Sequence, residues 1–381
     1  MSWLVVSSPW AETSGMPEAG TSQANGGSGF SGRPILRIGL ALMIGLVGAL
    51  LANLANMPLP FLLGPLMLCG LAAVSGIGIA PLPYGREAGQ IVVGLAIGLR
   101  FVPEVAIATA KLIPVMILAT VLIMSATTIA AFMLERLGGV DRKTAFFATS
   151  AAGLAEMAVV ANQKNADSET VAVVHLVRVT VIVTTIPFLV TIFGSDGGIA
   201  TTPITFASEA IALVALLVTA AIAALAVSRF KIPNSWLFVP ALIGAVVAGF
   251  GFGPFAVPPM FLTVAQILIG TWIGCRFRRQ ILARLPRVTI SAVATTAFLI
   301  AAAAAIAGLL TLITDLSFTT SLLAVAPAGV TEMVLTATAM HLDAATVTAF
   351  QIMRIAIVMT TIPITLKGFE LLSRRIDGKI L

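Results

Sequence analysis

One stretch of this chain occurs twice. Thr144 to Pro187 matches Thr320 to Pro363 without a gap, at an offset of 176 residues and with 15 identical positions. The identical positions include Glu, Met, Asp and Arg as well as the run TTIP, and a biased composition alone would not place these in register. A repeat at a fixed offset indicates a fold assembled from similar units. Any fold for this chain therefore has to accommodate two copies of one unit.

Long apolar runs fill both copies. Hydrophobic residues make up 59% of the 381 residues and charged residues only 10%, whereas a soluble domain has about 25% charged residues. A helix needs roughly 20 apolar residues to cross the hydrocarbon core of a bilayer, and the runs at 36–54 and 211–227 are two of several that approach this length. The sequence therefore predicts an all-α, polytopic membrane protein in contact with a lipid bilayer.

The predicted organisation has three parts. Residues 1–32 are rich in Gly and Ser, with no basic region leading into an apolar stretch, and we expect a disordered tail there. Residues 33–200 form the first membrane repeat and residues 201–381 the second. Each repeat offers six apolar segments. The fifth, at 144–163 and 320–340, carries small residues that are typical of a broken helix.

The positions of Lys and Arg predict how the copies are oriented. If the fifth segment enters the membrane and returns, each copy crosses five times and the second copy is inverted. All basic residues outside the membrane segments then lie inside, except Arg100, as the positive-inside rule favours. Six crossings per copy would instead place the arginine cluster at 276–287 outside. We therefore expect two inverted-topology repeats of about five transmembrane helices, each with a re-entrant or broken helix, and both termini in the cytoplasm.

Some residues with functional potential recur at matching membrane positions of both copies. They are Gly153, Glu156 and Arg178 in the first copy and Gly329, Glu332 and Arg354 in the second. A charge at the bilayer centre costs at least about 2.5–3.5 kcal/mol, so such residues are usually paired or functional. The functional interpretation is a solute or ion path where broken helices meet, with arginines or helix ends binding an anion and glutamates carrying a proton or cation. The alternative is two structural ion pairs, Glu156 with Arg178 and Glu332 with Arg354.

Three further polar residues are weaker candidates for a substrate or ion site. His175 lies three residues before Arg178, so both share one helix face, and the second copy has Gln351 at that position. His175 could relay a proton, although a lone histidine in a membrane is more often a hydrogen-bonded packing residue. Gln90 and Gln266 precede glycines spaced four residues apart, which are typical of close helix packing.

Several function classes lack their sequence signatures here. The chain has no GxxxxGK[ST] run, no helix-turn-helix or zinc-finger pattern, and only two histidines. Cys69 and Cys275 lie in apolar segments and are expected to be small buried residues rather than a disulfide or a metal pair. We therefore expect no enzyme activity, no cofactor, no metal site and no nucleic-acid partner.

A set of motifs links the chain to a known family. They are FLLGPLML around Pro65, the glycine-rich segment after Gln90, the blocks SAAGLAEM and APAGVTEM, and the two TTIP ends. Over about residues 34–370 the chain resembles the bacterial AbrB-type membrane protein family, whose members are often labelled as ammonia monooxygenases or as regulators of aidB expression. This family is distinct from the soluble, DNA-binding AbrB regulators. The resemblance implies a protein of the bacterial inner membrane, but no settled substrate and no catalytic residues.

The function expected from these features is secondary transport or export of a small solute, which could be an anion. Movement of one set of helices against the other would supply access from alternate sides. Two alternatives are a membrane-bound regulator that affects gene expression without transport and, less favoured, a membrane monooxygenase. Only a short tail and loops lie outside the apolar segments, and copper ligands are lacking, so neither alternative has positive support in the sequence. A homodimer is compatible with the sequence but not specified by it.

Overall fold

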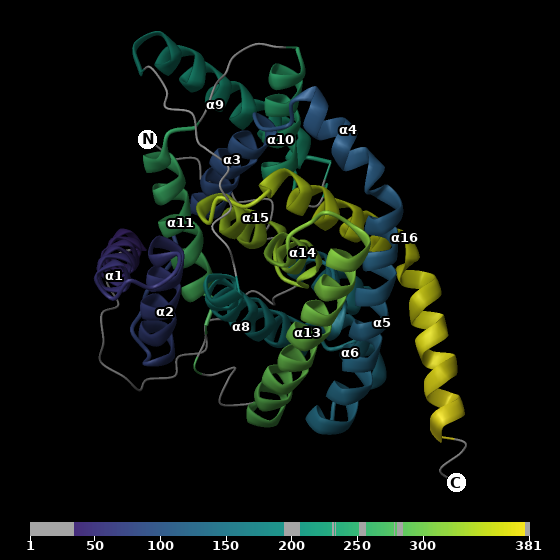
Figure 1. Ribbon diagram of the computed structural model, residues 1–381. Helices are drawn as coiled ribbons and strands as arrows, with labels where there is room; N and C mark the ends of the chain where they lie inside the picture. Colours follow the sequence, from purple (N-terminus) through teal and green to yellow (C-terminus); the bar gives the residue numbers. More distant parts are fainter. Residues whose placement is uncertain are drawn as a thin grey trace.

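The computed structural model describes residues 34–193, 206–230, 232, 234–250, 257–277, 279 and 285–377 (Figure 1). The side chains at 154–156, 206–210 and 374–377 are not part of this description, and the predicted disordered tail at 1–32 lies outside the described residues. All regular secondary structure in the described ranges is helical, which confirms the all-α prediction.

The helices follow the same order in both copies. The first copy contains α1 (Pro34–Leu54), α2 (Pro60–Val74), α3 (Gly85–Gly98), α4 (Pro103–Lys111), α5 (Ile113–Gly138), α6 (Arg142–Thr149), α7 (Leu154–Gln163) and α8 (Ser168–Phe193). The second contains α9 (Phe206–Ser228), α10 (Ser235–Gly249), α11 (Pro259–Gly274), α13 (Pro286–Ile313), α14 (Phe318–Val325), α15 (Val330–Ala339) and α16 (Ala344–Asp377). Within the described ranges, each helix except α4 has a counterpart in the other copy.

Helix length separates the spans from shorter elements. In the part of the chain that the structure describes, six helices are long and apolar enough to cross a membrane: α1, α5 and α8, with their counterparts α9, α13 and α16. Helices α2, α3, α10 and α11 have 14 to 16 residues. At 1.5 Å per residue they reach at most about 24 Å, less than the roughly 30 Å of a hydrocarbon core. Helix α3 is followed by α4 at a bend of 92°. By length, the described helices provide three of the five expected spans in each copy, and the bent pair of α3 and α4 would count as a fourth in the first copy.

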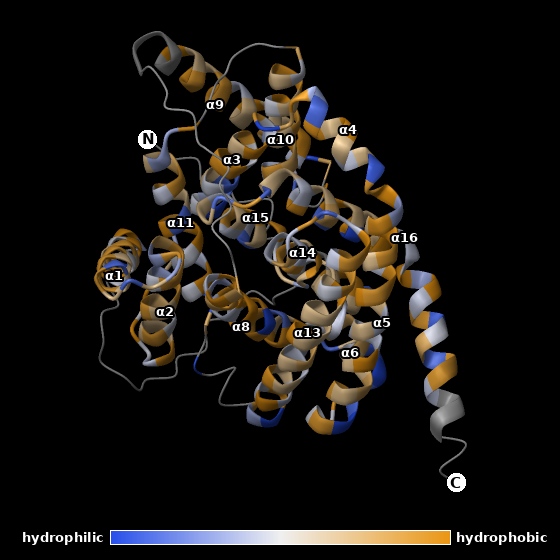
Figure 2. Ribbon diagram, in the orientation of Figure 1, coloured by the Kyte–Doolittle hydropathy of each residue, from blue (hydrophilic) through white to orange (hydrophobic). Residues whose placement is uncertain are grey.

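The exterior of the helices is apolar. In Figure 2 much of the ribbon of the outer helices is orange, the colour of hydrophobic residues. Large hydrophobic side chains are exposed on α1 and α9 among others, including Met43 at 61% and Ile211 at 79%. Apolar surface on this scale needs a partner or a bilayer to cover it. Together with the six long helices, it identifies a membrane protein.

The two copies are interleaved through glycine contacts. At Gly98 of α3 a Cβ atom would overlap the backbone carbonyl of Ala241 in α10, and at Gly270 of α11 it would overlap that of Leu62 in α2. The same close approaches are made by Gly94 and Gly274. Small residues at this spacing let helix backbones touch. The packing role expected for the glycines after Gln90 and Gln266 is thereby confirmed.

Equivalent helices of the two copies run antiparallel where they meet. Along α3, Arg86 lies against Trp272 and Gly89 against Ile269, so the numbering of α3 rises as that of α11 falls. Helices α5 and α13 also pack together, and a hydrogen bond from the side chain of Arg287 joins the start of α13 to the end of α5.

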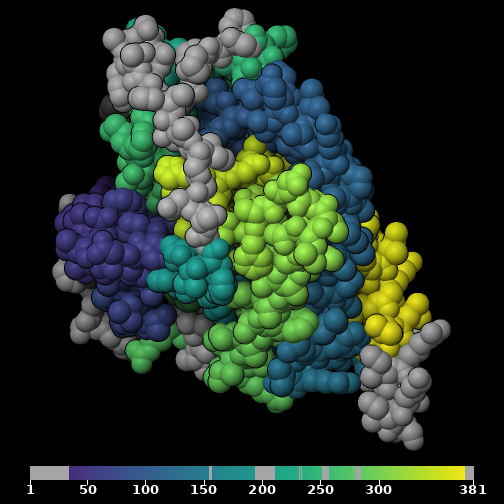
Figure 3. Space-filling view, in the orientation of Figure 1, coloured from purple at the N-terminus to yellow at the C-terminus, as the bar shows by residue number. Residues whose placement is uncertain are grey.

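Tertiary contacts divide the helices into two groups. We call α1, α2, α3, α9, α10 and α11 the flank group, and α5 to α8 with α13 to α16 the hairpin group. Among the described helices, contacts are extensive within each group and much fewer between the groups, where α3 touches α15 and α16. Buried apolar side chains of both groups nevertheless form one shared hydrophobic core. In Figure 1, α1, α2 and α11 lie to the left, while α5, α13 and α16 lie to the right. On the face shown in Figure 3, purple α1 and α2 lie to the left and light-green α13 lies to the right.

Candidate functional site

The fifth apolar segment is a broken helix in both copies, as predicted. Between α6 and α7 the backbone is extended, with ψ of 138° at Ser150 and 149° at Gly153. Between α14 and α15 the same conformation occurs, with ψ of 124° at Ala326 and 139° at Gly329. Pro327, inside the second break, has no N–H group to contribute to a helix. We call residues 150–153 the first tip and residues 326–329 the second tip.

The first broken segment folds back on itself. The backbone N–H of Asp167, which follows α7, donates to Thr144 Oγ1 at the start of α6 at a distance of 2.8 Å. Helices of 8 and 10 residues laid end to end would instead separate these points by roughly 27 Å. Helices α6 and α7 also pack on each other and on α8, and α14, α15 and α16 pack in the same way. The segment is therefore a hairpin in the first copy, and its counterpart has the same contacts.

Arg178 in α8 reaches the first tip. Its Nη1 atom donates to the carbonyl oxygens of Thr149 and Ser150, both at 2.8 Å, and the residue is only 2% exposed. The last carbonyl groups of a helix have no partner within the helix. The guanidinium therefore satisfies these groups, and its charge lies at the negative end of the α6 dipole.

Arg354 in α16 does the same at the second tip. Nη1 donates to Ala326 O at 2.6 Å and Nη2 to Ala328 O at 3.1 Å. The alternative interpretation of a structural ion pair between Glu332 and Arg354 is wrong, because no such pair lies within 4 Å among the described side chains. Carbonyl groups of the broken helix accept the hydrogen bonds of Arg354 instead. The corresponding alternative for Arg178 involves Glu156, whose side chain lies outside the described residues.

The two arginines are also linked electrostatically. The positive charge of Arg354 acts on Arg178. Helix α8 of the first copy contacts both α14 and α15 of the second. The hairpin group therefore brings the charged centres of both copies into one region.

Glu332 lies at the other side of the second break, in the first turn of α15. It is 4% exposed. Its carboxylate folds back over Gly329, where a Cβ atom would overlap it. A negative charge in the first turn is favoured by the helix dipole. A side chain at position 329 would therefore displace this carboxylate from its place over the start of α15.

A polar contact joins the two helix groups beside Glu332. Gln90 in α3 is 1% exposed, and its amide Nε2 donates to Thr331 Oγ1 in α15 at 2.9 Å. Arg86, one turn earlier in α3, exerts an electrostatic attraction on the Glu332 carboxyl without an ion pair within 4 Å among the described side chains. The contact thus joins an amide to a hydroxyl at the N-terminus of a half-helix, with a carboxyl beside it and a guanidinium farther away. We take it as the candidate functional site.

The sequence patterns did not single out Arg86, Thr331 and Trp272 as candidate site residues. The guanidinium carbon of Arg86 lies 4.7 Å from the centre of the Trp272 ring, and that of Arg276 lies 4.5 Å from it. Comparing the copies could not reveal these residues, because position 262, the counterpart of Arg86, is a leucine. The signal available was the single arginine one turn before Gln90, just ahead of the predicted apolar segment, because α3 begins at Gly85.

His175 lies against the first tip. It is 1% exposed, and its Nδ1 atom is 3.2 Å from the carbonyl oxygen of Val171. Its counterpart Gln351 donates from Nε2 to Leu323 O at 2.8 Å. Both residues are therefore buried, hydrogen-bonded neighbours of a broken helix. This agrees with a packing role, and the proton relay stays a prediction.

The matching contact in the other half of the protein is only partly described. Gln266 in α11 is 7% exposed, and Gly153 is the N-cap of α7. Residue 155, the counterpart of Thr331, has its side chain outside the described residues, as does Glu156. The candidate site is therefore defined by the contact of α3 with α15 alone.

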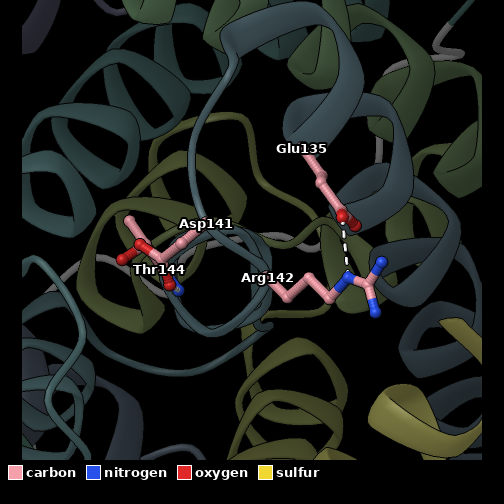
Figure 4. Close-up of polar contacts among 4 residues, drawn as sticks. All are labelled: Glu135, Asp141, Arg142 and Thr144. Atoms are coloured by element: carbon pink, nitrogen blue, oxygen red, sulfur yellow. Dashed lines mark hydrogen bonds and ion pairs between the residues drawn. The ribbon is translucent and has the colours of Figure 1, made fainter. Parts of the chain in front are cut away.

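Two cavities lie elsewhere in the hairpin group. One of about 20 Å³ is lined by Thr127, Ser150 and Ala151 at the first tip, and has room for about one water. A larger, open pocket of about 610 Å³ is lined by Glu135, Asp141, Arg142, Lys143 and Glu370. Figure 4 shows the ion pair of Arg142 with Glu135 at 2.9 Å, with Asp141 and Thr144 nearby. In the described part of the chain, no three His, Cys, Asp or Glu residues lie close enough to share a metal ion.

Comparison with known proteins identifies the family of this chain. The family described as "Transition state regulatory protein AbrB" matches residues 79–370, which include both hairpins. The chain belongs to the AbrB family. The family match covers the Gln90–Thr331 contact and both buried arginines.

Two relatives in this family are similar over most of their length. The chain is 26% identical over 353 residues to "Uncharacterized protein YhjN" of Bacillus subtilis, covering 84% of this chain and 90% of that protein. It is 24% identical over 336 residues to "Putative regulator AbrB" of Escherichia coli, covering 87% of this chain and 95% of that protein.

Proposed function

We propose that this AbrB-family protein is a secondary transporter of a small solute in the bacterial inner membrane. The observation that carries the proposal is the contact between α3 and α15. There, the side chains of Gln90, Thr331 and Glu332 are buried, and that of Arg86 is partly exposed. These polar and charged groups lie at the junction of two helix groups, beside a hydrophobic core that both groups share. Polar groups at membrane depth are costly, and they usually mark a substrate or ion path.

The arrangement of the copies supports this proposal. Antiparallel α3 and α11, and antiparallel α5 and α13, are the geometry expected of inverted-topology repeats. In transporters with such repeats, broken helices from both copies meet near the middle of the membrane. Relative movement of the flank and hairpin groups would expose the α3–α15 contact first to one side and then to the other. The termini are proposed to be cytoplasmic, in line with the positions of Lys and Arg.

The chemistry of the site favours an anionic solute. The N-terminus of α15 and the guanidinium of Arg86 both attract negative charge, and the Glu332 carboxyl lies beside that N-terminus in this structure. A solute anion would therefore compete with the Glu332 carboxylate for the same positive groups. Protonation of Glu332 would remove the competitor, so uptake of a proton and binding of an anion would be coupled.

A thermal-shift screen of small carboxylates, phosphate, sulfate and amines, followed by flux assays in proteoliposomes, tests the proposal. We expect at least one anion to stabilise the wild-type protein and to be transported. We expect Glu332→Gln to alter the pH dependence of that binding, while Glu104→Gln, at an exposed position in α4, leaves it unchanged. The proposal fails if compounds that bind are not moved across the bilayer.

A second candidate function is a regulatory one, favoured by the printed name of the Escherichia coli relative. A regulator without transport would change gene expression when deleted and would keep that effect when flux is blocked. Comparing gene expression in cells that carry the wild-type protein with cells that carry Glu332→Gln distinguishes a regulator from a transporter. If Glu332→Gln abolishes both flux and the expression effect, the regulatory effect is indirect.

A further inference from the structure

Trp272, in the last turn of α11, lies against two arginine side chains. The guanidinium carbon of Arg86 is 4.7 Å from the centre of the indole ring, and that of Arg276 is 4.5 Å from it. The two carbon atoms are therefore separated by no more than the sum of these distances. A guanidinium that stacks on an aromatic face keeps the N–H donors in its plane for another acceptor. The stack thus holds two positive charges where one anionic group can meet both.

Arg86 has donor capacity that the described residues do not use. Its Nε atom is buried and makes no hydrogen bond within the described part of the chain, and Arg86 takes part in no ion pair within 4 Å there. A buried donor without an acceptor is costly. The Arg86 side chain as a whole is partly exposed, and Arg276 is exposed. An acceptor from outside the protein can therefore approach both guanidinium groups.

The stack lies at one end of the flank group. Helix α3 begins at Gly85, directly before Arg86, and α11 ends two residues before Arg276. Near the end of α2, a Cβ atom at Gly70 would lie 3.5 Å from the ring of Phe277, which follows α11. Helices α2 and α11 therefore end, and α3 begins, at the same level. In the topology proposed above, this end of the flank group faces the cytoplasm.

A third arginine lies at this end, beside apolar side chains. Arg37, in the first turn of α1, is next to the loop between α2 and α3, because its carbonyl oxygen accepts a hydrogen bond from the N–H of Ala80 at 3.3 Å. Ile35 in α1 is 78% exposed and Leu71 near the end of α2 is 62% exposed. The acidic residue in the first turn of α3 is Glu87. Arginines beside exposed apolar groups are typical of the boundary between membrane and water, where the cytoplasmic leaflet carries anionic headgroups.

We propose that the stack of Arg86, Trp272 and Arg276 binds the phosphate of an anionic phospholipid, such as phosphatidylglycerol, from the cytoplasmic leaflet. The two guanidinium groups donate hydrogen bonds to the phosphate oxygens, and the indole ring keeps both groups in place. The acyl chains lie against the apolar exterior of the flank group. A soluble phosphate would gain nothing from that exterior, and this favours a lipid as the source of the phosphate.

The inference goes beyond the proposed transport function. Trp272 and Arg276 lie outside the contact of α3 with α15, and Arg86 is the residue that the two sites share. Lipid binding can be measured on purified protein without any solute. Loss of lipid binding and loss of flux are therefore separate results.

The test uses Trp272 as a fluorescent probe. The chain has four tryptophans, and replacement of Trp3, Trp10 and Trp236 by phenylalanine leaves Trp272 alone. The purified protein is placed in nanodiscs of phosphatidylcholine with a small fraction of phosphatidylglycerol that carries brominated acyl chains, because bromine quenches tryptophan only at short range. We expect stronger quenching than with the same fraction of brominated phosphatidylcholine. Inorganic phosphate added to the solution should not restore the fluorescence.

Two substitutions in this background locate the binding site. Arg276→Gln should lower the preference for phosphatidylglycerol about fivefold, which corresponds to about 1 kcal/mol for one arginine near an anionic membrane. Arg276→Lys, which keeps the charge but not the planar stacking group, should retain part of the preference. Arg136→Gln is the matched control, because it removes the same charge at an exposed position near the end of α5 in the hairpin group. It should leave the preference unchanged.

Three results would overturn the proposal. The first is equal quenching by the two brominated lipids. The second is an equal loss of preference in Arg276→Gln and Arg136→Gln, which would indicate a general attraction between the protein and anionic membranes. The third is recovery of the fluorescence on addition of inorganic phosphate, which would assign the stack to a soluble anion.

Discussion

Arg354 and Glu332 stabilise opposite sides of one helix break. A broken helix leaves carbonyl groups at the end of its first half and N–H groups at the start of its second. The guanidinium of Arg354 meets the carbonyl groups at the end of α14, and the carboxylate of Glu332 lies in the first turn of α15. The sequence shows that both charges recur at fixed positions, but it does not show their partners. A carboxylate and a main-chain carbonyl are both good acceptors for arginine, and only the folded geometry decides between them.

Replacement of Arg354 by alanine should destabilise the protein. The carbonyl groups of Ala326 and Ala328 would lose their hydrogen-bond donors in a buried site, at a cost of about 1–3 kcal/mol for each group left unsatisfied. Arg354→Lys should recover part of this loss, because its ammonium can reach one carbonyl. The free energy of unfolding in mixed micelles measures the effect. Arg279→Ala, at an exposed position, is the control and should change stability by less than about 0.5 kcal/mol. Equal stability of the Arg354 and Arg279 variants would contradict this role.

Gly329→Ala should affect solute binding more than stability. The added Cβ meets the flexible end of the Glu332 side chain, which can move aside. We expect a loss of about 1 kcal/mol or less in unfolding free energy, together with a changed affinity for any ligand of the site, read by isothermal calorimetry. Gly308→Ala in α13, where a Cβ meets nothing within 4 Å, is the matched control. Unchanged affinity in the Gly329 variant would show that the carboxylate position does not matter.

At the scale of elements, the small residues predicted the helix breaks correctly. The runs SAAG and APAG end α6 and α14, and the new helices begin directly after them. The contact of Gln90 with Thr331 could not be predicted in this way. A repeat comparison aligns each residue with its own counterpart, whereas this contact joins the third segment of one copy to the fifth segment of the other. Which unlike segments meet is decided by how the two copies interleave.

The close helix packing at the glycines of α3 and α11 gives a second prediction at the scale of elements. Gly98→Ala would place a Cβ against the backbone carbonyl of Ala241, which cannot move unless α3 and α10 separate. Such overpacking typically costs about 1–3 kcal/mol. The melting temperature of the purified protein should fall accordingly. Gly39→Ala in α1, with no neighbour within 4 Å, should be neutral or slightly stabilising. If both variants melt alike, the close packing of α3 on α10 is not needed for stability.

At the scale of the whole molecule, the two copies seen in the sequence are interleaved. Each of the two helix groups contains helices from both copies. Neither copy forms a body of its own, because α3 packs on α10 and α11 on α2. The copies nevertheless keep the same order of helices. A sequence repeat alone could not distinguish this exchange from two side-by-side domains.

Membrane topology follows from the proposed inversion of the copies. Reporters that are active only in the cytoplasm, fused at about Arg279 and after Leu381, should both be active, because the positive-inside rule places both positions inside. A periplasmic reporter at Arg100 should be active as well. A periplasmic position for Arg279 would contradict the inverted arrangement.

The central claim is that the junction of α3 and α15 opens to each side of the membrane in turn. The direct test is labelling of Thr331→Cys, which is 1% exposed in this structure, in a background carrying Cys69→Ser and Cys275→Ser. A membrane-impermeant maleimide is added either to right-side-out or to inside-out vesicles, with Glu104→Cys as an exposed control. We predict slow labelling of position 331 from both sides, and labelling of position 104 from one side only. Labelling of position 331 from a single side, or from neither, would contradict the account.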